Sequence, residues 1–378
     1  RGFCRGLYVI ESLPIRSGVE QCRVTFVQNI DAGGIIPTWV VDKNTGKALN
    51  IVQEIVDEFR QDEKVDAAEI RELTTFIREA GEEEVYSEEE EALIKRVRQK
   101  FLDSLKEGNW RKLRSPDNFV TMESIEQPGN NREQGTLIGR SVTVVDATIE
   151  QCAAWNYNKM TRKKLNERSQ NGELSKKMIK INNHSDLYYL LMDLGVAGLK
   201  PREWLVRMVW KVVDENTIWT SAEDVKHDDF PIGGGKGNEY VRGSADAFYK
   251  FEKLPDVRGV PQTRVTYCQN VDLKGNIPKI IANNRVTKVL AYLSRMRVKF
   301  DRSEDFDVRR RAELGRMIKK AKSTKESSAE ALKRFEDLYS ERRDCEQPRK
   351  DFGLAHESKV HATLFGGHGW GRTSVKVR

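Results

Sequence analysis

Apolar and polar residues alternate along several short segments of the chain, which is the pattern of strands with one buried face. The alternation predicts strands over residues 139–145, 178–181, 204–213 and 217–220. The polar run 214–216 suits a hairpin turn between the last two strands. These segments indicate an antiparallel sheet in the middle of the chain.

Helical periodicity replaces the alternation elsewhere. Residues 64–108 and 146–155 are predicted to be helical, and residues 240–252 and 262–271 return to the strand pattern. After Pro278, apolar residues recur at spacings of three and four and form one apolar stripe. The stripe predicts a long helix laid over a sheet.

Two distant stretches of the chain are similar to each other. Arg23-Val24-Thr25 and Gln28-Asn29 near the start recur as Arg264-Val265-Thr266 and Gln269-Asn270. The spacing is constant at about 240 residues, far longer than the repeats of solenoid proteins. We interpret the chain as part of a tandem array of domains.

This repeat divides the chain into four parts. Residues 1–60 are predicted to be the C-terminal part of one domain and 61–87 a charged helical linker. Residues 88–303 form a complete domain, and 304–378 a linker helix with the N-terminal part of a further domain.

Composition narrows the class of protein. Of 378 residues, 38% are hydrophobic and 33% are charged, which indicates a globular protein with a heavily charged surface. No apolar run approaches the length of a membrane helix. The five cysteines are scattered, which favours reduced thiols and a cytoplasmic location. The net charge of +7 is small for this length and favours neither nucleic acid nor membrane strongly.

Three motifs then appear in order along the later part of the chain. They are Val241-Arg242-Gly243, Arg264-Val265-Thr266-Tyr267 and the run 272–278, which reads Asp-Leu-Lys-Gly-Asn-Ile-Pro. Two earlier stretches, 144–150 and 200–203, fit the same pattern. In these motifs the chain resembles the START family, the steroidogenic acute regulatory protein-related lipid-transfer domains. Where that family often has a Trp-Asp pair, this chain has residues 161–166 instead.

The resemblance implies an α+β fold of the helix-grip type. A curved antiparallel sheet would wrap around the long C-terminal helix and enclose an apolar tunnel, with partial repeats on both sides. The implied function is the non-catalytic binding of a lipid or sterol, with intermembrane transfer or sensing as its use. Its partners would be the lipid and, transiently, a membrane surface, to which the protein would be peripheral.

Two other functions stay open at this stage. The helix-grip superfamily includes cyclases and hydrolases that act on apolar substrates, but no acid–base pair stands out, so we do not expect an enzyme. A tandem-domain scaffold is the other alternative. We expect no cofactor, no metal and no nucleic acid as partners. Residues 233–237 are rich in glycine but miss the phosphate-loop template, and the histidines lack ligand spacing.

Candidate ligand contacts come from the long helix and from the strands. On the helix, the stripe either lines the tunnel or packs as ordinary core. On the strand near residue 267, one face carries Tyr267, whose buried hydroxyl needs a partner that a ligand headgroup or the core itself can supply. Arg207 is expected to face solvent, opposite Trp210. The full set of predicted lipid-binding residues is Trp210, Thr220, Val265, Tyr267, Gln269, Val286, Val289, Leu290, Leu293 and Met296.

Overall fold

The computed structural model divides into two compact units, Arg1–Phe306 and Asp307–Arg378. The residues that it describes are 3–16, 18–31, 33–35, 38–80, 83–106, 110–127, 136–167, 172–234, 239–275, 277–324 and 333. Most of the further domain predicted near the C-terminus therefore lies outside the described residues.

One large antiparallel sheet forms the centre of the first unit. Its order is β3-β4-β5-β12-β11-β9-β8-β7-β6, and the short strand β10 pairs with β8 in parallel. The described strands at the two ends of this path, β3 and β6, do not pair with each other, so the sheet is not closed into a barrel. The strands are β3 Arg111–Lys112, β4 Thr121–Gln127, β5 Thr136–Val145, β6 Glu173–Lys180, β7 Ser185–Met192, β8 Arg202–Asp214, β9 Thr217–Asp224, β10 Val241–Arg242, β11 Ser244–Val257 and β12 Val260–Asp272.

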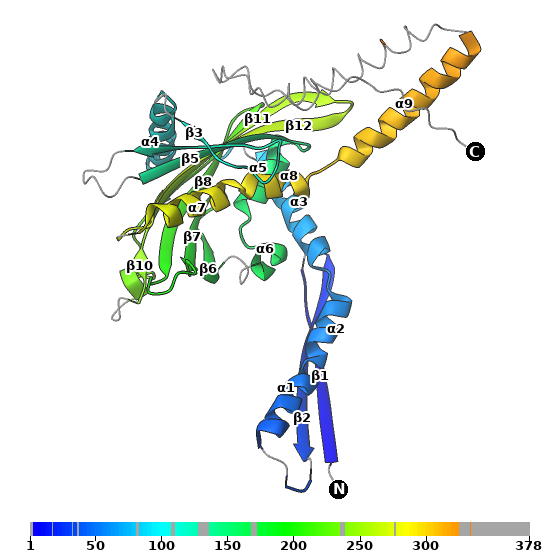
Figure 1. The fold of residues 1–378 in the computed structure, drawn as a ribbon, viewed down its shortest axis with the longest axis vertical. Coiled ribbons are helices and arrows are strands. Elements are labelled where there is room, and N and C mark those ends of the chain that lie inside the picture. Colours follow the sequence, from blue (N-terminus) through cyan, green and yellow to red (C-terminus); the bar gives the residue numbers. More distant parts are fainter. Residues whose placement is uncertain are drawn as a thin grey trace, which may run out of the picture. The chain divides into compact units, whose positions relative to one another are not determined.

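Helices cover both faces of this sheet. Figure 1 shows α7 and α8 crossing one face, and buried residues of α5 belong to the same core as theirs. The helix α4 packs on the opposite face, through Leu93, Val97 and Phe101 against Ile138 and Cys268. The helices of this part are α3 Asp62–Ala80, α4 Glu88–Lys106, α5 Ile149–Tyr157, α6 Arg162–Asn166, α7 Lys279–Leu290 and α8 Tyr292–Lys299. The helix α9 Ser303–Thr324 belongs mostly to the second unit.

Local sequence explains where α5 begins. The Thr148 side chain accepts a hydrogen bond from Gln151 N, and the Gln151 side chain accepts one from Thr148 N at 3.0 Å. This reciprocal capping box satisfies two backbone donors at the start of the helix. Residues 149 and 152–157 of α5 are buried, so the helix is held at both its end and its face.

The predicted long helix after Pro278 is divided in two. α7 ends at Leu290, Ala291 has a ψ angle of −4°, and α8 begins at Tyr292. The apolar stripe continues through the break, because Leu290 and Leu293 are both fully buried in one core cluster. Apolar periodicity predicted the buried face but carried no signal for a change of backbone angle at an alanine.

The segment predicted to be a charged linker contains α3, which packs into the core. Ile70 and Ile77 are buried in the cluster that also contains residues of α5 and the sheet. Asp66, also buried, accepts hydrogen bonds from the backbone N–H groups of Arg162 and Lys163, at 2.7 and 3.0 Å. The helix α3 is therefore part of the packed core, and the predicted domain boundary at residue 88 stays a prediction.

The repeated sequence forms the same elements twice. β1 Phe3–Arg16 and β11 are both 14 residues long, and β2 Val19–Asp31 and β12 are both 13. Both hairpins shift register just before the turn, at Leu13/Arg16 and at Leu254/Val257. The helix α1 Thr38–Leu49 corresponds in the same way to α7, each with 12 residues, and α2 Ile51–Phe59 follows where α8 follows α7.

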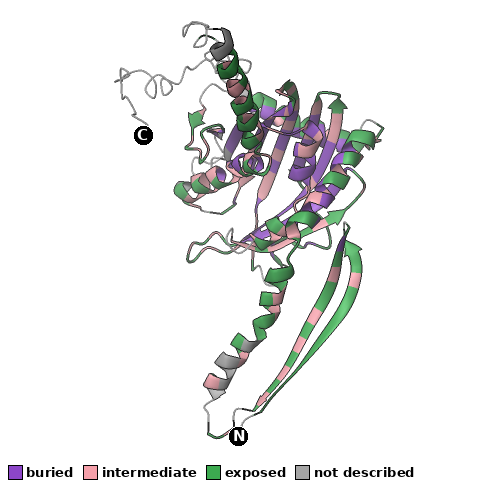
Figure 2. Cartoon of the chain, turned by 90° about the vertical axis from the view of Figure 1, so that its right-hand side faces the viewer, coloured by how far each residue is buried: buried purple, intermediate pink, exposed green. Residues whose placement is uncertain are grey.

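The two hairpins differ in what surrounds them. β11 pairs with β9 and β12 pairs with β5, so the second hairpin is in the middle of the large sheet. β1 and β2 form a two-stranded sheet whose residues are mostly exposed, as Figure 2 shows in green. Burial in Figure 2 is concentrated instead on the large sheet and its covering helices.

Candidate functional site

The inner face of the sheet, the one covered by α7 and α8, carries a row of residues from five neighbouring strands. Register places Trp210 of β8 beside Thr220 of β9, then Tyr249 of β11, Tyr267 of β12 and Ser141 of β5. All five are buried. Three of the residues predicted from sequence, Trp210, Thr220 and Tyr267, are thus brought together in one row.

Other predicted strand residues lie on the same face. Val265 is two residues from Tyr267 on β12, is fully buried and belongs to the same core cluster. Gln269 lies on the other side of Tyr267, opposite Gly139 of β5, and is half-buried. Alternation along β12 predicted this shared face correctly.

The predicted helix stripe faces this row. Val286, Leu290, Leu293 and Met296 are buried in the core cluster that contains Tyr267, and Val289 packs against it while half-buried. At one end the contact is tight, because a Cβ atom added at Gly139 would lie 2.8 Å from Val286 Cγ1. Ordinary core packing therefore accounts for α7 where it crosses β5, and a ligand contact by the stripe stays a prediction.

Tyr267 has partners within the protein. Its ring stacks on that of Tyr249, with centroids 4.1 Å apart, and its hydroxyl donates a hydrogen bond to Gln269 Oε1. Burial raises its pKa far above the ordinary value, so the hydroxyl stays protonated at neutral pH. This geometry fits a tyrosine that is bonded within the core, and contact with a ligand stays a prediction.

Several polar atoms of this interior are buried without a hydrogen-bond partner among the described residues. Three belong to the row: Trp210 Nε1, Thr220 Oγ1 and Ser141 Oγ. Two more, Tyr292 Oη and Ser294 Oγ, belong to α8. Each buried polar atom without a partner costs about 1–3 kcal/mol, and such atoms also occur on the outer face, at Ser221 and Thr266.

Cations and aromatic rings meet at one side of this interior. Lys159 Nζ is 4.9 Å from the centre of the Tyr292 ring and 5.5 Å from that of Tyr249. Lys164 Nζ is 4.1 Å from the Trp155 ring. Arg295 is 5.2 Å from the Tyr292 ring. These residues, which together form the lysine cluster, are Lys159, Lys164, Arg295, Trp155, Tyr249 and Tyr292.

Burial lowers the pKa of both lysines in this cluster. It lowers the pKa of Lys159 from 10.5 to about 7, with the nearby charges of Lys176 and Arg295 acting in the same direction. Burial also lowers the pKa of Lys164 well below its ordinary value, and Lys159 adds to this effect. Among the described residues, neither lysine forms a salt bridge, so only neutral groups and rings hold the two ammonium ends.

Sequence reasoning missed these lysines. Both lie in or next to the short segment 161–166, which replaces the family's Trp-Asp pair, and their pattern there is that of a solvated loop. No signal in the neighbouring residues marks them, since their burial depends on rings that other elements supply.

Charged residues on the outer face form a separate network. Arg207 lies on the face opposite Trp210, as predicted, but it pairs with Glu89 at 2.9 Å and Glu90 at 2.8 Å of α4, and its side chain is only 13% exposed, so the expectation that it faces solvent is wrong. Glu90 also contacts His184 Nε2 at 3.1 Å. Burial alone would raise the pKa of Glu90, but hydrogen bonds from Ser87, Asn182 and His184 outweigh it and lower the pKa to about 2. This network joins α4 to the sheet and is structural.

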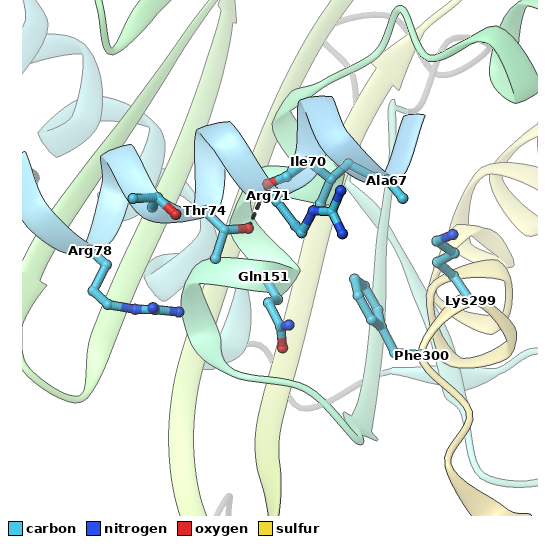
Figure 3. A pocket seen from close by; sticks show the side chains of 9 residues that line it. Ala67, Ile70, Arg71, Thr74, Arg78, Gln151, Lys299 and Phe300 are labelled. Carbon is cyan, nitrogen blue, oxygen red and sulfur yellow. Dashed lines mark hydrogen bonds between the residues drawn. The ribbon is translucent and has the colours of Figure 1, made fainter. Parts of the chain in front are cut away.

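A pocket of about 350 Å³ lies beside α3, away from the predicted residues. Figure 3 shows its walls, which are α3, the start of α5 and the end of α8. Arg71, Arg78 and Lys299 make it basic, and Phe300 connects it to Trp155, with ring centres 6.4 Å apart. Its lining residues are Ala67, Ile70, Arg71, Thr74, Thr75, Arg78, Gln151, Lys299 and Phe300.

Other classes of site are not found in the described part of the chain. Cys4, Cys22, Cys152 and Cys268 are free thiols there, and Cys345 lies outside it. No group of three metal-ligating side chains gathers among the described residues. None of the described helices combines the length and apolar character needed to cross a bilayer.

No family model and no curated protein matches the chain. Among solved structures, human StAR-related lipid transfer protein 5 is 19% identical over 55% of this chain and 95% of its own, with a TM-score of 0.41. The lipid transfer and protein localization domain of human StarD13 is 18% identical over 58% of this chain and all of its own, with a TM-score of 0.39. Norcoclaurine synthase from Thalictrum flavum is 13% identical over 44% of this chain and 87% of its own, with a TM-score of 0.27.

The fold of this chain rests on its own geometry. The antiparallel strand order and the helices α7 and α8 across the inner face give the central part of the chain the α+β arrangement of the helix-grip type that the sequence predicts. The sheet is open between its described end strands β3 and β6, and the enclosed apolar tunnel stays a prediction.

Proposed function

We propose that the central domain binds one lipid or sterol between the inner face of its sheet and the helices α7 and α8, and does not convert it chemically. The observation that carries the proposal is the row of buried polar atoms without partners on a face that is otherwise apolar. An apolar molecule with one polar group has the chemistry that such a face needs.

Two energetic contributions support this function. Burial of the apolar body of a lipid contributes roughly 25 cal/mol for each Å² removed from water. A headgroup that bonds to Thr220 Oγ1 or Trp210 Nε1 adds a net contribution of about 1 kcal/mol for each hydrogen bond and relieves an unpartnered atom. The first contribution gives affinity and the second gives selectivity among lipids.

The setting we propose is a tandem array of such domains in the cytoplasm. The matching bounds of the two hairpins and of α1 and α7 support the array. In this setting the domain approaches a membrane surface transiently, takes up its ligand and transfers or senses it. The ten predicted contact residues are the ones that we expect to line the binding region.

The test compares two buried threonines on opposite faces of the sheet. Thr220 faces α7 and α8, whereas Thr266 is on the outer face of β12, and both hydroxyls are buried without a partner among the described residues. Thr220→Val is expected to reduce lipid retained from vesicles about fivefold, the equivalent of one hydrogen bond, while Thr266→Val leaves retention unchanged. Native mass spectrometry after removal of the vesicles measures the bound fraction.

Two results would contradict the proposal. If both variants and the unchanged protein retain the same amount of lipid, Thr220 does not contact the lipid. A folded protein that retains no lipid from any vesicle would favour the scaffold function instead.

A further inference from the structure

Three basic side chains from different parts of the fold surround one tyrosine ring. The Nζ atoms of Lys159 and Lys164 lie 4.9 and 5.7 Å from the ring centre of Tyr292, and the Arg295 guanidinium lies 5.2 Å from it. Lys159 follows α5, Lys164 is in α6 and Arg295 is in α8. Like charges this close repel one another, and the repulsion grows where water is excluded.

Neighbouring carboxylates balance this charge only in part. Glu167 pairs with Arg295 at 3.4 Å, and that arginine side chain is half exposed. Asp66 attracts Lys164, but its two oxygens already accept from the backbone N–H groups of Arg162 and Lys163. The amino groups of Lys159 and Lys164 are therefore left without a carboxylate in contact among the described residues.

The lysine cluster also has more donors than acceptors. Lys159 Nζ donates to Asn156 Oδ1 at 3.0 Å, and Lys164 Nζ donates to the carbonyls of Trp155 and Asn158 at 2.6 and 2.8 Å. Asn156 is fully buried, and its Nδ2 donor has no partner among the described residues. The hydroxyl of Tyr292 is also buried without a hydrogen-bond partner among the described residues. The missing complement is a group that accepts several hydrogen bonds and carries negative charge.

We propose that the lysine cluster binds a phosphate or phosphate-ester group. A phosphate offers several acceptor oxygens and compensates the charge of both lysines through charge-assisted hydrogen bonds. Tyr249 belongs both to this cluster and to the inner row of the sheet, where it neighbours Thr220 and Tyr267. The inference therefore rests on the proposed function and deepens it: the preferred ligand is a lipid with an anionic phosphate headgroup.

The test uses two lipids that differ in the phosphate alone. The full chain is incubated with phosphatidylcholine vesicles that contain either phosphatidic acid or diacylglycerol, and the lipid that stays with the separated protein is identified by mass spectrometry. Phosphatidic acid is expected to be retained at least about tenfold more than diacylglycerol, as one or two charge-assisted hydrogen bonds predict. In a parallel arm, inorganic phosphate alone is added and the midpoint of thermal unfolding is measured.

Substitutions in the lysine cluster test whether it causes the preference for phosphatidic acid. The double substitution Lys159→Met and Lys164→Met is expected to remove the preference for phosphatidic acid and any response to inorganic phosphate. Lys288→Met, at an exposed lysine of α7, is the matched control and is expected to change neither. If the double variant does not fold, Lys159→Gln alone is expected to reduce the preference several-fold.

The outcomes separate this inference from the proposed function. Equal retention of both lipids, or a preference that the lysine variants do not change, overturns the inference and leaves lipid binding intact. No retained lipid together with a lysine-dependent response to inorganic phosphate supports the anion site with free phosphate as its source, and the lipid function fails. If neither lipid nor phosphate has an effect, both proposals are wrong.

Discussion

At the scale of single residues, the structure assigns different tasks to polar groups that look alike in the sequence. Lys159 and Lys164 lie among aromatic rings, whereas Lys100 and Lys211 pair with Asp246 and Glu91. Nothing in the sequence around each lysine marks this difference, since it depends on which residues distant in the chain supply carboxylates. The inner and outer faces of β8 and β12, by contrast, followed from alternation alone.

The low pKa of Lys159 leads to a prediction about stability. In the unfolded chain this lysine regains its ordinary pKa of 10.5, so between about pH 7 and 10.5 the unfolded state binds more protons than the folded state. Stability therefore rises with pH across that window, and the cost of burying the charge is complete below pH 7. Lys159→Met is expected to stabilise the protein by on the order of 2 kcal/mol at pH 6 and by much less at pH 10.

Urea unfolding at the two pH values measures this difference. The groups that face Lys159 are Lys164, Lys176, Arg295, Tyr249 and Tyr292, and the Lys159→Met substitution leaves all of them in place. Lys288→Met serves as the reference for loss of a surface charge. If the stability difference between Lys159→Met and the unchanged protein is the same at both pH values, burial does not lower the pKa of Lys159.

At the scale of elements, the strands and the division of their residues between two faces were predictable from alternation, although the central strands are buried on both faces and not on one. The break at Ala291 and the packing of α3 were not predictable from the sequence. α3 is rich in charge, and its buried residues Val65, Ile70 and Ile77 are separated by acidic and basic ones, which is also the pattern of a solvated linker. What decides between the two is the surface that the helix meets, and α5 provides that surface.

The role of α3 can be tested with two isoleucines at equivalent positions of the repeat. Ile77 in α3 is 1% exposed, whereas Ile318 in α9 is 56% exposed. Ile77→Ala is expected to lower the free energy of unfolding by about 2–4 kcal/mol, because it leaves a cavity in the core. Ile318→Ala is expected to change it by less than about 0.5 kcal/mol. Urea unfolding followed by tryptophan fluorescence gives both values, and equal effects would mean that α3 is a linker.

At the scale of the whole molecule, the repeat in the sequence coincides with two hairpins of matching length, and each hairpin has a register shift before its turn. It did not predict how different their surroundings are. β11 and β12 are buried because β9 and β5 pair with them, while β1 and β2 have no further strand beside them among the described residues. The proposed binding region needs the strands β5, β8, β9, β11 and β12 side by side, and among the described residues only the large sheet supplies them.

The central claim is that this domain holds one lipid. Native mass spectrometry of the full chain, after incubation with a cell lipid extract and removal of free lipid, tests it most directly. The account predicts a complex with one lipid molecule per chain, whose mass fits a lipid with a phosphate headgroup. A folded chain that shows only its own mass after this treatment would contradict the account.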